Sequence, residues 1–197
     1  FDIFAPSILI YFSKNLTTLY VGITYLTKNE INMGKVVSFD APNKDESSDK
    51  SIFKVFLGGT IDNGDSVDWQ HKIINTLKER EDEIDVELHV LNPRRDNWKE
   101  DSNEWMEGQV TWELENQEKS DLIVMNREPK SKSPISLLEI GLNAKDNKLA
   151  VFCTEEFYRF NNIRITCARY GVPLIKNNDL DSIISYIIYK ANKKKIS

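Results

Sequence analysis

The chain has 197 residues, a formal net charge of −5, and hydrophobic and charged contents of 40% and 29%, which are ordinary for a globular protein. The acidic balance argues against a general nucleic-acid-binding protein, which needs a basic surface to meet phosphates. No stretch has the apolar length of a membrane span, and the apolar start lacks the basic residues and cleavage site of a signal peptide. We therefore predict a cytoplasmic protein with neither a membrane nor a nucleic-acid partner.

The cysteines and histidines predict neither a disulfide framework nor a metal site. Cys153 and Cys167 lie in apolar or helical contexts that are typical of reduced core residues. His71 and His89 have no metal-ligand spacing around them, which disfavours zinc. We expect no metal and no other cofactor.

The N-terminal part of the chain differs in pattern from the rest. β-prone runs at residues 7–12 and 19–26 flank a turn-like Ser-Lys-Asn, which predicts a β-hairpin. The stretch that follows, up to Ser51, is rich in Asn, Asp, Ser and Lys with little periodicity, which predicts a linker or arm. We therefore expect a hairpin and linker of unknown function over residues 1–51 and a single domain over residues 52–197.

From residue 52 onward, apolar strand-like segments alternate with amphipathic helical segments. The predicted strands are residues 53–57, 86–91, 121–125, 149–153 and 172–175. The predicted helices are residues 66–80, 104–119 and 161–170, one that begins at Pro134, and a last one striped by Leu180, Ile183, Ile184, Ile187 and Ile188. This alternation predicts an α/β fold with a five-stranded parallel sheet and helices on both faces.

Polar residues gather where three of the predicted strands end. Ligands of such sheets bind outside the carboxyl ends of the strands, so residues that follow different strands converge there. The helix that carries Glu139 begins at the same rim. The residues expected to meet Glu139 are Asp62 after the first strand, Asp96 after the second and Asn126 after the third.

The stretch SPISLLEIG places Glu139 among apolar neighbours near the start of a helix. Pro134 suits the first turn, because its missing N–H would have no partner there. The apolar face predicted at helical spacing consists of Leu137, Leu138, Ile140, Leu142 and Ala144. A helix N-terminus favours negative charge, so Glu139 is predicted to stay ionised, as a nucleophile or an electrostatic stabiliser does. The alternative is a solvated Glu in a helix-favouring position.

The first strand ends in Gly58, Gly59 and Thr60, which we consider candidates for substrate binding. A glycine pair allows a backbone to approach a ligand closely because no Cβ intervenes, although a plain turn has the same composition. The segment is neither a Walker loop nor a dinucleotide fingerprint, since the required Lys and the third Gly are missing. Asp65 suits a helix cap, whereas Asp62 fits either a cap or a ligand contact.

The second strand is followed by NPRRDNW. Arg94 and Arg95 fit a phosphate or a pairing with carboxylates. Asp96 is a candidate for contact with the substrate, and Trp98 offers a surface on which a base stacks.

Three other residues have two interpretations each. Trp105 and Trp112 share one face of the following helix, where either packing or a subunit interface is expected. Asp121 leads the third strand and is either a turn residue or a carboxylate that orients or protonates a leaving group.

Five stretches occur in order over most of residues 53–189: FLGGTIDNGDSVDWQ, NPRRDNW, SDLIVMN, SPISLLEIGLNA and FYRFNNIRITCARYGVPL. Together they resemble the nucleoside 2-deoxyribosyltransferase-like family. The resemblance implies a flavodoxin-like, Rossmann-like sheet and an enzyme that cleaves nucleoside N-glycosidic bonds.

The resemblance also implies roles for individual residues. Glu139 attacks the anomeric carbon, a glycosyl-enzyme forms, the base leaves, and another base or water takes the sugar, with the oxocarbenium-like transition state of a retaining glycosidase. Ser133 and Ser136 hold the sugar, and Asp121 matches an aspartate near the base. Asn162 matches an asparagine that completes the site of a neighbouring subunit, which implies a homo-oligomer.

The sequence also departs from the family. Better-known members carry an acidic residue about where Ser133 stands, so the group that protonates the base is left open among Asp62, Asp96 and Asp121. The arginines of NPRRDNW fit a nucleotide as well as a nucleoside. We predict a transferase whose second partner is a free nucleobase. The alternatives are a nucleoside or nucleotide N-glycoside hydrolase and a non-catalytic nucleotide sensor on the same scaffold.

Overall fold

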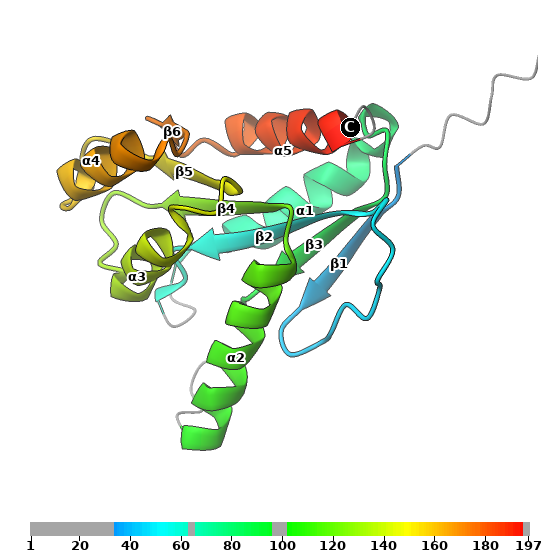
Figure 1. Ribbon diagram of the computed structural model, residues 1–197, viewed down its shortest axis with the longest axis horizontal. Helices are drawn as coiled ribbons and strands as arrows, with labels where there is room; N and C mark the ends of the chain where they lie inside the picture. The colour runs from blue at the N-terminus through cyan, green and yellow to red at the C-terminus, as the bar shows by residue number, and fades with distance from the viewer. Residues whose placement is uncertain (1–33, 63–65, 96–101, 195–197) are drawn as a thin grey trace, which may run out of the picture. The chain divides into compact units, whose positions relative to one another are not determined.

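The computed structural model describes residues 34–62, 66–95 and 102–194, and the predicted hairpin lies outside them. Within the described residues, six strands form one parallel sheet (Figure 1). The strands are β1 (Val36–Asp40), β2 (Phe53–Gly59), β3 (Leu88–Asn92), β4 (Leu122–Arg127), β5 (Leu149–Cys153) and β6 (Leu174–Ile175). The helices are α1 (Trp69–Glu79), the short 3-10 helix η2 (Glu81–Glu83), α2 (Asn103–Lys119), α3 (Pro134–Asn143), α4 (Phe160–Tyr170) and α5 (Leu180–Lys194). The predicted α/β class with a parallel sheet is confirmed.

β1 is a strand that the sequence did not predict. It pairs with β3, from Val36 beside Leu88 to Asp40 beside Asn92. Its sequence, VVSFD, is a β-favouring run between polar loops, and most of its side chains are only partly buried because it lies at the edge of the sheet. The sheet therefore has six strands rather than five, and the additional strand comes from the stretch interpreted as a linker.

The order of the strands indicates where a ligand site is expected in this fold. The order across the sheet is β1-β3-β2-β4-β5-β6, so the chain leaves β2 on one side to form β3 and then crosses to the other side to form β4. In open parallel sheets, ligands bind at such a reversal, outside the carboxyl ends of the two central strands. Here those ends are Gly59 of β2 and Arg127 of β4.

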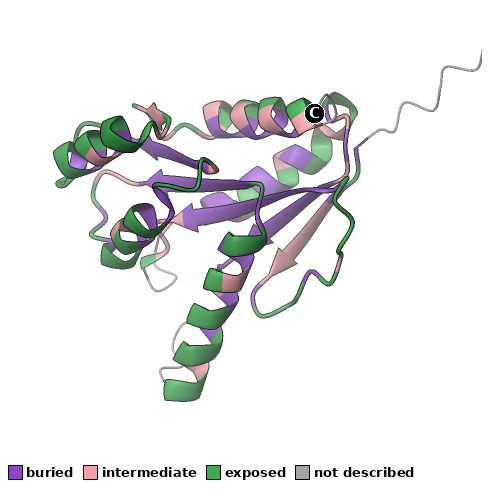
Figure 2. Ribbon diagram, in the orientation of Figure 1, coloured by how far each residue is buried: buried purple, intermediate pink, exposed green. Residues whose placement is uncertain are grey.

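Helices cover both faces of the sheet, and each face has its own core. α1 and α5 pack on one face, whereas α2, α3 and α4 contribute to the core on the other (Figure 1). The first core includes Val55, Leu57, Val124, Ile73 and Ile187, and the second includes Phe56, Met125, Val151, Trp112 and Ile140. Strands β2 to β5 are almost wholly buried between these layers (Figure 2).

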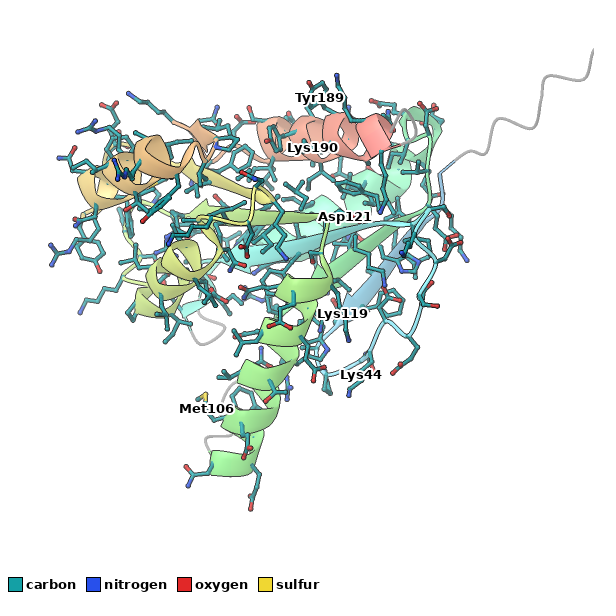
Figure 3. All side chains as sticks on the ribbon, viewed as in Figure 1. Lys44, Met106, Lys119, Asp121, Tyr189 and Lys190 are labelled. Atoms are coloured by element: carbon teal, nitrogen blue, oxygen red, sulfur yellow. The ribbon has the colours of Figure 1, made fainter. Side chains whose placement is uncertain are left out.

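The helix α2 is polar on its buried side and apolar on part of its exposed side. Gln109, Asn116 and Gln117 are buried, as is Trp112. The exposed apolar residues are Met106, Val110 and Leu114, which recur every four residues; Met106 lies towards the end of α2 that is far from the sheet (Figure 3). An amphipathic helix of a globular protein normally has the opposite arrangement.

α3 has the same arrangement. Ser136, Glu139 and Asn143 are buried beside Ile140. The predicted apolar face is therefore only partly correct: Ile140 and Ala144 are in the core, but Leu138 and Leu142 are exposed, together with Ile135. We call Met106, Val110 and Leu114 of α2 with Ile135, Leu138 and Leu142 of α3 the outer apolar rows.

None of the helices in the described ranges is both long and apolar enough to cross a membrane. In the same ranges, no cluster of three or more His, Cys, Asp or Glu side chains could hold a metal ion.

Candidate functional site

The two central strands approach each other closely where they end. Gly59 has a φ of +135°, a conformation that favours glycine, and a Cβ there would lie 2.1 Å from the backbone oxygen of Asn126. A Cβ on Gly58 would lie 2.7 Å from the sulfur of Met125. The backbone N–H of Thr60 donates to the same Asn126 oxygen at 3.0 Å. The predicted close approach at the glycine pair is thus an approach of β2 to β4.

A cluster of hydroxyl groups lies just beyond these strand ends. The Ser131 and Ser133 hydroxyls contact each other and lie 3.2 Å and 3.3 Å from a carboxylate oxygen of Asp62. The Thr60 hydroxyl is 3.3 Å from that of Ser133 and accepts the backbone N–H of Glu128 at 3.1 Å. Asp62 therefore lies among hydroxyl groups that face the start of α3.

The backbone at the start of α3 is fixed from both sides. Ser133 takes a left-handed conformation with a φ of 33° and precedes Pro134, the first residue of the helix. Ser136 donates its hydroxyl to the backbone oxygen of Gly59 at 3.0 Å. This bond ties the first turn of α3 to the end of β2, so Ser133 and Ser136 both lie at the crevice between the central strands.

Glu139 is buried between α3 and α2. Gln117 of α2 donates its side-chain amide to Oε1 of Glu139, and Asn143 donates to the Gln117 oxygen at 2.6 Å. Only 9% of Glu139 is exposed, so the alternative of a solvated Glu is wrong. The Gln117 amide thus orients a carboxyl group that has little access to water.

The ionisation of Glu139 differs from the prediction. Its pKa is raised from 4.5 to about 7; burial is the largest cause, the charge of nearby Glu113 adds to the shift, and the Gln117 hydrogen bond and the charge of Arg127 oppose it. Glu139 is the sixth residue of α3, beyond the first turn, where the effect of the helix N-terminus falls off. The effect of desolvation on the pKa therefore outweighs the effect of the helix N-terminus, and the carboxyl group is only partly ionised at neutral pH.

A second carboxyl group, Glu113, lies on α2 near Glu139. Its pKa is raised, chiefly by burial, and it interacts electrostatically with Glu139. Gln109 donates to Oε1 of Glu113 at 2.7 Å and to the backbone oxygen of Pro93 at 2.8 Å. Gln109, Glu113 and Gln117 are spaced four residues apart, so they share one face of α2. That polar row was present in the sequence and was not recognised.

Arg127 is a further residue that the sequence analysis did not single out. Its side chain is 0% exposed, its Nη2 is 3.4 Å from the backbone oxygen of Ser133, and its guanidinium lies 4.7 Å from the centre of the Phe157 ring. Within the described residues, its Nε and Nη1 have no hydrogen-bond partner. Burial lowers its pKa to about 10, while the negative charges of Asp62 and Glu139 counteract part of that shift. A buried positive charge therefore lies near both carboxyl groups.

The remaining predicted site residues lie in different places. Asn126 is buried in β4, and its Oδ1 has no partner within the described ranges. Asn162 is exposed on α4, beside a hollow that Leu137 and Gly141 of α3 also line. Asp96 and Trp98 lie outside the described residues.

Asp121 lies at the opposite end of the sheet from Glu139. It precedes β4 (Figure 3). It accepts the backbone N–H of Lys54 at 2.8 Å and pairs with Lys194 at 2.8 Å. These contacts join the starts of β2 and β4 to the end of α5. The structure does not bring Asp121 to the other candidate residues, because a residue before a parallel strand lies at the edge away from the carboxyl ends.

The two arginines after β3 contact residues of the protein itself. Arg94 is buried, donates to the backbone oxygen of Ser66 at 2.9 Å and lies 3.6 Å from a carboxylate oxygen of Asp68. Arg95 stacks on Trp105, with 5.1 Å between its guanidinium carbon and the ring centre. Arg94 thus fits the carboxylate pairing that was one of the two expectations.

Comparison with known families gives a match over the central part of the chain. Residues 52–157, more than half of the 197, match a family described as nucleoside 2-deoxyribosyltransferase like. The matched segment contains β2, α2, β4 and α3. Glu113, Arg127 and Glu139 lie in the last three of these elements, and Thr60 directly follows β2. A comparison with curated proteins gives no match.

Proposed function

The chain belongs to the nucleoside 2-deoxyribosyltransferase-like family, as its motifs predicted, and from this premise we propose that it cleaves and re-forms nucleoside N-glycosidic bonds through Glu139. The observation that carries the proposal is the buried Glu139 carboxyl group, held by Gln117 beside the carboxyl ends of the two central strands. A carboxylate in such a site stabilises the positive charge that develops on a sugar as its base departs.

The reaction has two displacement steps. In the first, an oxygen of Glu139 bonds to the anomeric carbon while the bond from that carbon to the base nitrogen breaks, and its electron pair leaves with the base. In the second, the nitrogen of another base attacks the same carbon and the bond to Glu139 breaks, which frees the carboxylate; the proton that this base loses balances the proton that the first base takes up as it leaves. When water attacks the anomeric carbon in place of the second base, the reaction is a hydrolysis.

The hydroxyl cluster suits a sugar. The Ser133 hydroxyl lies within hydrogen-bond distance of the Thr60 and Ser131 hydroxyls, which all donate and accept, and Asp62 adds a carboxylate acceptor. We assign these side chains to the binding of the sugar hydroxyls, next to the carboxyl group that attacks the anomeric carbon.

Arg127 acts on the charge of Glu139. Its positive charge lowers the pKa of that carboxyl group and opposes the effect of burial. Because Arg127 is fully buried, water screens this interaction little. We assign to Arg127 the role of keeping a reactive fraction of Glu139 ionised.

The outer apolar rows support a homo-oligomer. Six large apolar side chains on two helices beside the site are exposed in the single chain, and exposed apolar surface gathered in this way marks protein–protein contacts. Asn162 lies on α4, next to α3. We propose that a second copy covers these rows.

The test is a chromatographic assay of the purified full chain with a panel of deoxynucleosides and their monophosphates, with and without a second free base. Formation of the exchanged nucleoside supports the transferase, and release of base without exchange assigns a hydrolase. A folded protein that binds a ligand saturably but releases no base would refute catalysis and leave a nucleotide sensor.

The rate of base release should depend on the ionisation of Glu139. The carboxylate form attacks, and the pKa of this group is about 7, so the single-turnover rate constant is expected to rise with pH through about 7 and then level off. A carboxyl group at its usual pKa of 4.5 would already give a level rate at pH 6. The measurement is rapid-quench base release between about pH 5 and pH 9, with circular dichroism to check the fold. A rate constant that stays level throughout that range would contradict the assignment.

A further inference from the structure

The connection from β2 to α1 carries two of the groups assigned to the sugar. We call residues 60–62 and 66–68 the β2–α1 loop. The backbone oxygen of Thr60 accepts the indole N–H of the buried Trp69 at 2.8 Å, which fixes the start of the loop. Asp62 is exposed and has a φ of 46°, a conformation that persists only where the surroundings hold it. The contacts on the far side of the loop therefore matter for Asp62.

Ser66 closes the β2–α1 loop onto itself. Its hydroxyl donates to the backbone oxygen of Ile61 at 3.0 Å, and its backbone N–H donates to the same oxygen at 3.3 Å. Ile61 directly precedes Asp62, so these bonds fix the backbone next to the carboxylate. A residue that holds Ser66 therefore also holds Asp62.

Arg94 holds Ser66 through two nitrogens. Its Nη2 donates to the backbone oxygen of Ser66 at 2.9 Å, and its Nη1 donates to the Ser66 hydroxyl oxygen at 3.3 Å. Its Nε lies 3.6 Å from a carboxylate oxygen of Asp68, the residue that caps α1. Every nitrogen of this buried guanidinium thus contacts the β2–α1 loop. A planar fork of this kind is available to arginine and not to lysine.

The backbone of Arg94 is anchored to the ends of two strands. Its N–H donates at 3.0 Å to Oδ1 of Asn92, the last residue of β3. Asn92 in turn donates its side-chain amide to Oδ1 of Asp40, the last residue of β1, at 2.7 Å. Arg94 therefore joins the carboxyl ends of the sheet to a loop that carries binding groups, and groups held by regular elements in this way are positioned precisely.

We propose that Arg94 is a positioning residue, which holds the β2–α1 loop so that Thr60 and Asp62 meet the sugar, and that it is not a ligand for the phosphate of a nucleotide. The inference rests on the proposed function. A phosphate on Arg94 would have to break the contacts that its three nitrogens make with Ser66 and Asp68. A displacement of the loop by about 1 Å is enough to lower the rate by about 10²-fold.

The first test compares a deoxynucleoside with its 5′-monophosphate as substrates of the full chain. Arg94→Lys keeps the charge but loses the fork, so kcat/KM is expected to fall about 10- to 100-fold, by the same factor on both substrates. Arg80→Lys is the matched control, since Arg80 lies at the end of α1 and pairs with Glu83, and it should change neither value. A loss confined to the monophosphate would assign Arg94 to the phosphate and overturn the proposal.

A double-mutant cycle tests whether Arg94 acts through Asp62, and it decides where only one of the two compounds is a substrate. Asp62→Ala removes the carboxylate that the loop presents. In that background, Arg94→Lys should lower kcat/KM by a factor at least about threefold smaller than in the wild type. Equal losses in the two backgrounds would show that the residues act independently and would overturn the proposal.

The hold on the loop is also measurable without turnover. Hydrogen exchange of the Ser66 backbone N–H, followed by NMR, should be at least about tenfold faster in Arg94→Lys and unchanged in Arg80→Lys. The N–H of Val124, buried in β4, is the reference for global stability. Unchanged exchange at Ser66 in Arg94→Lys would refute the role of Arg94 in holding the loop.

Two further outcomes are distinct. If Arg94→Lys does not fold, Ser66→Ala takes its place: it removes the hydroxyl between Arg94 and Ile61 and should lower kcat/KM about threefold or more, and no loss would overturn the proposal. A wild-type protein that releases no base from any nucleoside would refute the proposed function itself. The exchange measurement then still decides whether Arg94 holds the loop.

Discussion

Glu139→Gln is expected to abolish turnover and at the same time to make the folded protein more stable at alkaline pH. The neutral amide removes the nucleophile, so base release should fall by at least about three orders of magnitude. Because Gln is nearly isosteric with Glu and keeps an oxygen that accepts the Gln117 amide, the packing between α2 and α3 should be preserved.

The gain in stability follows from the pKa of Glu139. Below pH 4.5 the carboxyl group is protonated in both the folded and the unfolded chain, so it imposes no penalty on folding. As the pH rises from 4.5 to about 7, the unfolded chain ionises first and the folded state loses stability. Above that range the penalty is complete, and the size of the pKa shift gives an upper bound of about 3 kcal/mol. Glu139→Gln removes the penalty.

Urea unfolding at about pH 5 and about pH 8 measures this effect. The variant should exceed the wild type in free energy of unfolding by more at the higher pH. Glu118→Gln, the same substitution at an exposed position of α2, is the matched control and should change neither activity nor stability beyond about 0.5 kcal/mol. Base exchange retained in Glu139→Gln would refute its role as the nucleophile.

Gly59→Ala is expected to prevent stable folding. The added Cβ would lie 2.1 Å from the backbone oxygen of Asn126, and the φ of +135° is one that side chains other than glycine rarely adopt. The clash is with backbone in the middle of the sheet, so it cannot be relieved by the rotation of a side chain. We expect a loss of more than about 4 kcal/mol in the free energy of unfolding, or insoluble protein.

Gly108→Ala provides the control for this prediction. Gly108 is exposed in α2, and a Cβ there would meet no atom within 4 Å. Because alanine favours helix over glycine, this variant should be more stable than the wild type by up to about 1 kcal/mol. The measurement is the melting temperature of each variant compared with that of the wild type. A soluble, fully stable Gly59→Ala protein would contradict the described approach of β2 to β4.

The fold was predictable because its elements follow simple periodicity. The buried strands β2 to β5 are continuous apolar runs, and the helices between them show stripes, so alternation alone indicated the parallel sheet. β1 was missed since its five residues, VVSFD, are half-buried at an edge and show no long apolar run. A strand of this kind is recognised through its partner β3, and that pairing is not visible in the local sequence.

The site was predictable in part. Glu139 stood out as a charged residue in an apolar context, and the strand-end rule placed Asp62 near the start of its helix, where Ser133 and Ser136, named through the family resemblance, also lie. Asp121 was named because it leads its strand and matches a family aspartate, and the structure places it with Lys54 and Lys194, at the edge of the sheet away from the carboxyl ends. The ionisation of Glu139 was also predicted wrongly, because it depends on burial by α2, a contact between segments that are distant in the sequence.

Glu113, Gln117 and Arg127 were missed for a common reason. Charged and amide side chains on helices and at strand ends are usually solvated, so their presence gives no local signal. Gln117 is buried where the polar sides of the inverted helices α2 and α3 meet, and Arg127 is buried at the end of β4 beside Ser133 and Phe157. The row of polar residues at intervals of four on α2 is the signal that could have revealed them.

The inverted pattern of α2 and α3 also limits which amino-acid substitutions these helices can accept in evolution. On an ordinary surface helix, most substitutions at the outer positions change stability little, because the side chains there are exposed to water. On α2 the inner position Gln109 fixes a carboxyl group, and the next position, Val110, belongs to an outer apolar row. Under the proposed function, adjacent codons are thus subject to different selective demands, one for the site and one for the contact with a second copy, so that substitutions on either face of the helix are selected against.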